Sequence, residues 1–236
     1  MTKPAPPRKP RAPAKDAAPA ARSPRQAAAR KAPVREPRKA ARRPPRRTRE
    51  MIDAAAQVFA EKGYYGASTQ DIADRLGIRQ ASLYYYLASK EAALETVCAR
   101  GTEGYVERGQ AIAAQPGSSA DKLRALILQH LSPMLDRPHY VRVFQTQRQF
   151  LPESSRRRIG ALARQYERVV QGVIAEGVRS GEFRADIAPQ HVMLTVLGAC
   201  NAATAWPGAI SGMTVQLAAD TIAALILNGV KRAPRR

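Results

Sequence analysis

Between about residue 49 and residue 230, apolar residues recur every three or four positions, which is the spacing of one face of an α-helix. No segment alternates apolar and polar residues in the manner of a half-buried strand. The first helical pattern is carried by Ile52, Ala55, Ala56 and Phe59, and Gly63 is expected to end that helix. The periodicity therefore predicts an all-α protein.

Local signals divide this region into separate helices. Ser68 stands three residues before Asp71, a capping-box pattern that is expected to open a short helix ending at Leu76, and Gly77 closes it. Further helices are expected over residues 80–87, 89–113, 122–131, 138–149, 155–180, 191–205 and 215–230.

The first 47 residues have a different composition. They carry 16 Lys and Arg residues against 2 acidic ones, so they hold +14 of the formal net charge of +20, and 11 of the 18 prolines. Such a segment buries too little apolar surface to offset the entropy of ordering, and residues 1–44 are therefore predicted to be a disordered basic tail. This asymmetry favours nucleic acid as a partner, with an anionic membrane surface as the second choice.

Several classes of protein find no support in the sequence. Cys98 and Cys200 are far apart and are expected to be small buried apolar residues, and the three histidines lack the spacing of a metal site. We find no paired catalytic carboxylates, nucleophile elbow or phosphate-binding glycine loop. Apolar runs of membrane-spanning length and a signal peptide are also missing. We expect a cytoplasmic protein that is not an enzyme and needs no cofactor or metal.

The most informative stretch is GIRQASLYYYLASKE, residues 77–91. Because neighbouring residues on a helix point about 100° apart, the three consecutive tyrosines cannot all be buried. If Leu83 and Leu87 face the core, Tyr85 points nearly opposite to them, Tyr84 lies on the flank and Tyr86 stays near the edge of the core.

Two short helices joined by the turn at residues 76–79, with a longer helix in front of them, form a helix-turn-helix at about residues 68–87. In this motif the second helix enters the DNA major groove. Outward phenols can then contact phosphates and thymine methyl groups, and the Gln80 amide can read adenine. Lys90, at the start of the next helix, adds its charge to free backbone N–H groups and predicts a phosphate site.

The segment GYYGASTQDIADRLGIRQASLYYYLASKEAALETV resembles the DNA-binding domain of the TetR/AcrR family of regulators, and the likeness extends over about residues 45–105. The resemblance implies DNA contacts at Thr69, Gln70, Gln80, Ser82, Tyr84, Tyr85 and Lys90. Arg79 stands where many members have a serine cap, which weakens the cap and offers a further groove contact. Thr69 alternatively serves as a capping residue, and Gln70 as solvated helix surface.

The resemblance also implies a C-terminal helical domain, residues 106–236, with an effector pocket and a dimer interface. An apolar pocket with a few polar groups is expected to be lined by Tyr105, His130, Met134, Phe144, Tyr166, Asn201 and Trp206, each of which could instead belong to the core. The residues around 198–201 and 206–207 resemble regulators of lipid or steroid catabolism that sense acyl-CoA thioesters.

The last two predicted helices are more apolar than outer helices of a monomer need to be. Small residues among them would let helices approach closely, so we expect a homodimer, although a core within one chain is the alternative. The residues concerned are Leu194, Leu197, Gly198, Cys200, Ala203, Leu217, Ala218, Ile222, Leu225 and Ile226. A two-fold symmetric dimer implies a palindromic operator on double-stranded DNA.

These features together predict a ligand-responsive transcriptional regulator, most simply a repressor that a small, largely apolar effector, such as a lipid or an acyl-CoA, releases from its operator. The alternative is an architectural protein that compacts DNA through its basic tail. A compacting protein has no use for a helical sensor domain, which favours the regulator.

Overall fold

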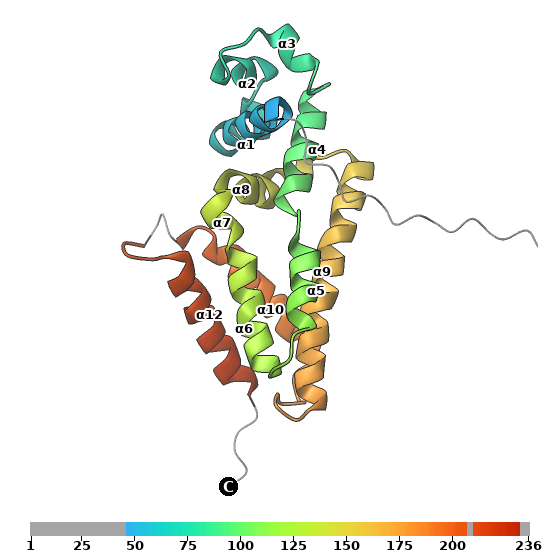
Figure 1. Cartoon of the computed structure of the whole chain (residues 1–236), viewed down its shortest axis with the longest axis vertical. Coiled ribbons are helices and arrows are strands. Elements are labelled where there is room, and N and C mark those ends of the chain that lie inside the picture. Colours follow the sequence, from blue (N-terminus) through green and yellow to red (C-terminus); the bar gives the residue numbers. More distant parts are fainter. Residues whose placement is uncertain (1–45, 207–209, 232–236) are drawn as a thin grey trace, which may run out of the picture. The chain divides into compact units, whose positions relative to one another are not determined.

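A computed structural model describes residues 46–206 and 210–231, which belong to one compact unit of the chain, residues 43–236. The predicted basic tail, residues 1–44, lies outside the described residues, so its disorder stays a prediction. Figure 1 shows the path of the chain through this unit.

Four helices make up the first part of the unit: α1 (Arg46–Gly66), α2 (Thr69–Arg75), α3 (Gln80–Tyr84) and α4 (Lys90–Gly101). In Figure 1, α1, α2 and α3 gather at one end, and α4 leads away from them toward the later helices.

The later helices are α5 (Tyr105–Ala113), α6 (Ser119–Leu131), α7 (Pro133–Asp136), α8 (Pro138–Gln147), the short 3₁₀ helix η1 (Arg148–Phe150), α9 (Glu153–Arg179), α10 (Pro189–Ala203) and α12 (Val215–Val230). The described residues contain one isolated β-bridge, between Phe183 and Lys231, and no strand. The all-α prediction is therefore confirmed.

The local signals around the helix-turn-helix act as predicted. Ser68 accepts a hydrogen bond from the Asp71 N–H, and the Asp71 carboxylate accepts one from the Ser68 N–H at 2.7 Å, which completes the capping box. Gly77 has a φ of 64°, a left-handed conformation that glycine adopts without steric cost. Gly63 has a φ of 70° and breaks the regular path of α1. Arg79 precedes α3 without a side-chain cap.

Two predicted helices differ in the structure. The helix expected over residues 89–113 is two helices, because Gly104 takes a left-handed φ of 79° between α4 and α5. The helix expected over residues 80–87 ends at Tyr84, since Ser89 must be extended, with φ −158° and ψ 171°, to cap α4. A short helix, α7, was not predicted.

Two hydrophobic cores hold the unit together. One is built from α1–α4, and it also takes in Tyr140 and Val143 of α8, Leu151, and Ile159 of α9. The other is built from α6, α9, α10 and α12 around Leu126, Val170 and Ile222. Because α8 contributes to the first core and also packs beside α7, it connects the helix-turn-helix to the later helices.

Candidate nucleic-acid interface and ligand pocket

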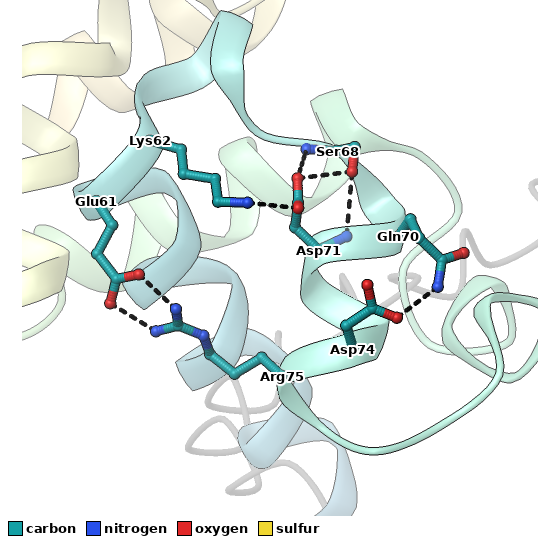
Figure 2. Close-up of polar contacts among 7 residues, drawn as sticks. All are labelled: Glu61, Lys62, Ser68, Gln70, Asp71, Asp74 and Arg75. Carbon is teal, nitrogen blue, oxygen red and sulfur yellow. Dashed lines mark hydrogen bonds and ion pairs between the residues drawn. The ribbon is translucent and has the colours of Figure 1, made fainter.

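The first helix of the motif, α2, is tied to α1 by ion pairs (Figure 2). Lys62 Nζ lies 2.5 Å from Asp71 Oδ1, and Arg75 donates to both carboxylate oxygens of Glu61. The bonds from Lys62 and Ser68 lower the pKa of Asp71 to about 2, and the bond from Arg75 lowers that of Glu61. These contacts add to the packing of buried Ile72 and Ala73, which holds α2 against α1.

The three tyrosines are arranged as the helical geometry predicts. Leu83 and Leu87 are buried, whereas Tyr85 is 88% exposed, Tyr84 48% and Tyr86 37%. The Tyr85 and Tyr86 rings contact each other edge to face, with centroids 5.4 Å apart. Tyr85, the most exposed of the three, makes no side-chain hydrogen bond within the described residues, so its phenol is accessible to a partner.

Three of the proposed DNA-contacting residues form one hydrogen-bonded cluster. Gln80 Nε2 donates to Thr69 Oγ1 at 2.6 Å, and Thr69 Oγ1 lies 3.1 Å from the Tyr84 hydroxyl. The cluster joins the start of α2 to both ends of α3. It leaves the Gln80 carbonyl oxygen and the remaining amide hydrogen able to meet a base edge.

The other proposed contacts surround this cluster. Arg79 and Ser82 are exposed on and before α3, and Gln70 is exposed on α2, where its amide donates to Asp74 Oδ1 at 2.6 Å. Lys90 Nζ lies 4.5 Å from the centre of the Tyr64 ring, a cation–π contact that holds the ammonium at the first turn of α4. Polar groups from α2, α3 and α4 thus face solvent together, as contact with a DNA backbone and its bases requires.

A second feature is a cavity of about 280 Å³ between the later helices. Its wall includes Gly101 at the end of α4, Tyr105 of α5, His130 of α6, Phe144 of α8, and residues of α9 and α10. The full lining is Gly101, Thr102, Tyr105, His130, Val141, Phe144, Gln145, Arg148, Leu162, Ala163, Tyr166, Glu167, Leu194, Leu197, Gly198, Asn201 and Thr204. We call this cavity the effector pocket, after the ligand-binding role that the sequence predicts for this part of the chain.

A chain of polar groups crosses the effector pocket. His130 Nε2 and Gln145 Nε2 each lie 3.3 Å from Asn201 Oδ1, and Thr204 Oγ1 donates to Gln145 Oε1 at 2.8 Å. Desolvation lowers the pKa of His130 to about 4, so the ring is neutral near pH 7. Burial raises the pKa of Tyr105 to about 12, so its phenol is neutral too. The polar chain therefore offers uncharged hydrogen-bonding groups among apolar walls, while Arg148 and Glu167 add charged side chains to the lining.

Five of the seven residues proposed for the pocket line it: Tyr105, His130, Phe144, Tyr166 and Asn201. Met134 and Trp206 do not line it; both pack against the second core. Sequence reasoning missed Gln145 and Arg148, although with Val141 and Phe144 they follow the i, i+3, i+4, i+7 spacing of one helix face.

Helix α8 joins the effector pocket to the DNA-binding helices. Its Phe144 faces the pocket, whereas Gln147 Oε1 accepts a hydrogen bond from the Tyr64 N–H at 2.9 Å, at the end of α1. On the same helix, the Tyr140 hydroxyl donates to Asp53 Oδ1 at 2.6 Å. A change in the pocket wall can therefore reach α1 directly.

Helices α10 and α12 divide the apolar residues that the sequence singled out. Cys200, Ala203, Ala218 and Ile222 are buried in the second core. In contrast, Leu225 is 71% exposed, Leu194 55% and Leu217 48%. Both cysteines are free and buried, as predicted. Within the described segments, no helix combines the length and the apolar character needed to cross a membrane.

The chain matches two family models. Residues 51–97 match "Bacterial regulatory proteins, tetR family", and residues 116–230 match "Tetracyclin repressor-like, C-terminal domain". A solved transcriptional regulator of the TetR/AcrR family from Thermobifida fusca is 33% identical, covers 79% of this chain and 99% of its own, and superposes with a TM-score of 0.61.

Two characterised relatives are similar over much of the chain. The transcriptional repressor KstR2 of Rhodococcus jostii is 27% identical over 186 residues, which is 78% of this chain and 91% of KstR2. The fatty acid metabolism regulator protein of Bacillus subtilis is 26% identical over 135 residues, 57% of this chain and 70% of that protein.

Helices α2 and α3, joined by the hydrogen bonds of Thr69, form a helix-turn-helix. With these similarities, they define a DNA-binding transcriptional regulator of the helix-turn-helix class. The chain belongs to the TetR/AcrR family.

Proposed function

We propose that this regulator is a repressor that binds a palindromic operator as a homodimer and releases it when a largely apolar effector fills the effector pocket. The observation that carries the proposal is the position of the pocket. Its wall contains the last residue of α4 and one face of α8, and both helices pack on α1. The similar protein KstR2 is a transcriptional repressor, which supports repression as the mode of action proposed here.

The chemistry of the pocket favours an acyl chain with a polar end. Phe144, Leu162, Leu194 and Leu197 supply apolar wall, and the polar chain from His130 to Thr204 supplies donors and acceptors for a carbonyl group. A relative that regulates fatty acid metabolism supports this class of effector. The regulator would act in the cytoplasm, at the nucleoid, without a cofactor.

Genome-wide mapping of bound DNA followed by operator release tests the repressor proposal. Binding at a few palindromic sites is expected, whereas uniform coating would favour a DNA-compacting role. A labelled operator should then be released by medium-chain acyl compounds. Ala163→Phe, which places a ring in the pocket, should keep operator affinity but abolish release. Release of the variant at the parent concentration of effector would contradict the proposed pocket.

The homodimer has a separate test. The exposed leucines of α10 and α12 are proposed to meet their copies in the second chain, so Leu225→Glu should yield monomers in sedimentation and weaken operator binding. Leu135→Glu is the matched control, because Leu135 of α7 is 68% exposed and lies outside this face. Equal sedimentation of both variants and the parent would place the interface elsewhere.

A further inference from the structure

A second hollow adjoins the effector pocket. It has a volume of about 330 Å³ and lies between η1 and the first turns of α9. Phe144, Arg148, Ala163 and Glu167 line both cavities, so the two share a wall. A ligand held in the effector pocket could therefore extend past these side chains into the second hollow.

Three arginines, Arg148, Arg156 and Arg164, line this second hollow, which we call the arginine hollow. The Arg148 guanidinium lies 5.0 Å from the centre of the Phe144 ring, and Arg156 Nη1 donates to the Gln149 carbonyl oxygen at 3.3 Å. Arg164 rests against Gly160, where an added β-carbon would lie 3.2 Å from Arg164 Nη1.

The three charges have no acidic partner in the described part of the chain. The neighbouring arginines do, since Arg157 pairs with Glu153 and Arg158 with Glu95. The run at residues 156–158 could be taken from the sequence as a solvated helix start, but its first member lines a cavity while the other two form ion pairs. Glu167 is the acidic residue of the hollow, and it leaves the lining with a net positive charge.

We propose that the arginine hollow binds the phosphates of a coenzyme A thioester whose acyl chain occupies the effector pocket. This inference rests on the proposed function and narrows the effector class. Guanidinium groups bind phosphate through paired, charge-assisted hydrogen bonds, and several phosphates can satisfy several arginines. A free fatty acid carries one carboxylate, which would leave most of these charges unpaired and most of the hollow unfilled.

Titration with octanoyl-CoA and with octanoate separates the two classes of ligand. Arg156→Gln combined with Arg164→Gln should weaken octanoyl-CoA binding about tenfold or more and leave octanoate binding unchanged, because hydrogen bonds to charged groups are lost only for the phosphates. Arg157→Gln is the matched control on the same helix and should bind octanoyl-CoA as the parent does. Glu167→Gln should act in the opposite direction and strengthen octanoyl-CoA binding, since it removes the negative charge from the hollow.

Two results would overturn the inference. Unchanged octanoyl-CoA affinity in the double variant would make the hollow a solvated arginine face, and an equal loss in Arg157→Gln would indicate general surface charge. Operator release is measured in parallel to keep the two proposals distinct. If the double variant binds octanoyl-CoA as tightly as the parent does, the arginine hollow is ruled out. If octanoate still releases the operator in that case, the repressor proposal stands. Arginine-dependent octanoyl-CoA binding without operator release supports the hollow and contradicts the repressor proposal.

Discussion

Gln80 is positioned before DNA arrives, because its amide donates to Thr69 Oγ1 and Thr69 in turn contacts the Tyr84 hydroxyl. Gln80→Ala should therefore reduce discrimination at one base position of the operator by about 1–3 kcal/mol. Tyr84→Ala and Lys90→Ala should instead weaken operator and random DNA alike, since phosphate contacts carry no sequence information. Binding to a panel of single-base operator variants measures both effects.

Gln115→Ala is the control for Gln80→Ala, because Gln115 is exposed in the turn after α5. It should leave affinity and discrimination unchanged. A Gln80→Ala protein that ranks every operator variant as the parent does would remove Gln80 from base recognition.

We expect His130 to make the free energy of unfolding depend on pH. Its pKa is lowered by desolvation to about 4 in the folded protein, against about 6.5 when unfolded, so between these values the unfolded chain binds more protons. Stability from this group is fully present above pH 6.5 and is lost as the pH falls toward 4, by up to about 3 kcal/mol. Urea unfolding over this range should show the loss.

His130→Gln, which retains an amide for Asn201, should flatten that slope. The groups that face His130 are Asn201, Tyr105 and Tyr166, none of which is charged near neutral pH, so no neighbour offsets the effect. An equal slope in parent and variant would assign the acid sensitivity to other groups.

Gly101 ends α4 where that helix meets α8. A β-carbon at this position would lie 3.0 Å from the Tyr140 carbonyl oxygen and 3.1 Å from Phe144 Cβ, so backbone would have to move. Gly101→Ala should lower the melting temperature and change effector affinity. Gly172→Ala in α9, where no atom lies within 4 Å, should instead stabilise the protein by about 0.4–1 kcal/mol, because alanine reduces the entropy of the unfolded chain. A stabilising Gly101→Ala would show that α4 and α8 separate freely.

One unbroken helix over residues 89–113, as the sequence predicted, would have joined the helix-turn-helix directly to the pocket wall. The structure breaks that helix at Gly104 and offers α8 as a second path, through the bond between Gln147 and the Tyr64 N–H. Gln147→Ala should reduce the factor by which effector weakens operator binding, while operator affinity without effector changes little.

Equilibrium linkage checks this path, because the factor by which operator weakens effector binding must equal the factor by which effector weakens operator binding. Titrations in both directions, for parent and Gln147→Ala, measure the two factors. If both factors are the same in Gln147→Ala as in the parent, the hydrogen bond from α8 does not carry the coupling, and α4 is the path between pocket and DNA.

Sequence reasoning was strongest where structure depends on neighbouring residues. The cap at Ser68, the turn at Gly77 and the outward phenols of Tyr84 and Tyr85 follow from local geometry and were predicted. The break at Gly104 was not predicted. A glycine inside a helical pattern costs the helix only about 1 kcal/mol, so its presence does not by itself indicate a turn.

The pocket and its neighbourhood depend on packing between distant helices. Large polar or aromatic residues such as His130 and Asn201 were found from their type. Arg148 and Arg164, in contrast, resemble solvated surface residues until η1 and α9 come together. Met134 was drawn from the same residue types and packs in the core instead. Residue type alone therefore cannot separate a cavity lining from a core.

The basic tail should add affinity for DNA without adding specificity. Residues 1–44 carry 14 Lys and Arg against 2 acidic residues, a net +12, and they join α1, which packs against α2 of the helix-turn-helix. Two tails per dimer would bring this charge to flanking DNA, where arginine is attracted to narrow minor grooves. Each phosphate neutralised contributes about −0.9 to the slope of log K against log salt.

Deletion of residues 1–44 should accordingly weaken binding to operator and random DNA, flatten the salt slope by several units if a handful of charges engage on each tail, and keep the preferred operator sequence. Anisotropy titrations at a series of salt concentrations measure the slope, and selection from a randomised operator pool reads the sequence preference. An unchanged slope would mean that the tail does not contact DNA and serves solubility instead. A changed preference would make it a reader of bases, because charge alone attracts every sequence equally.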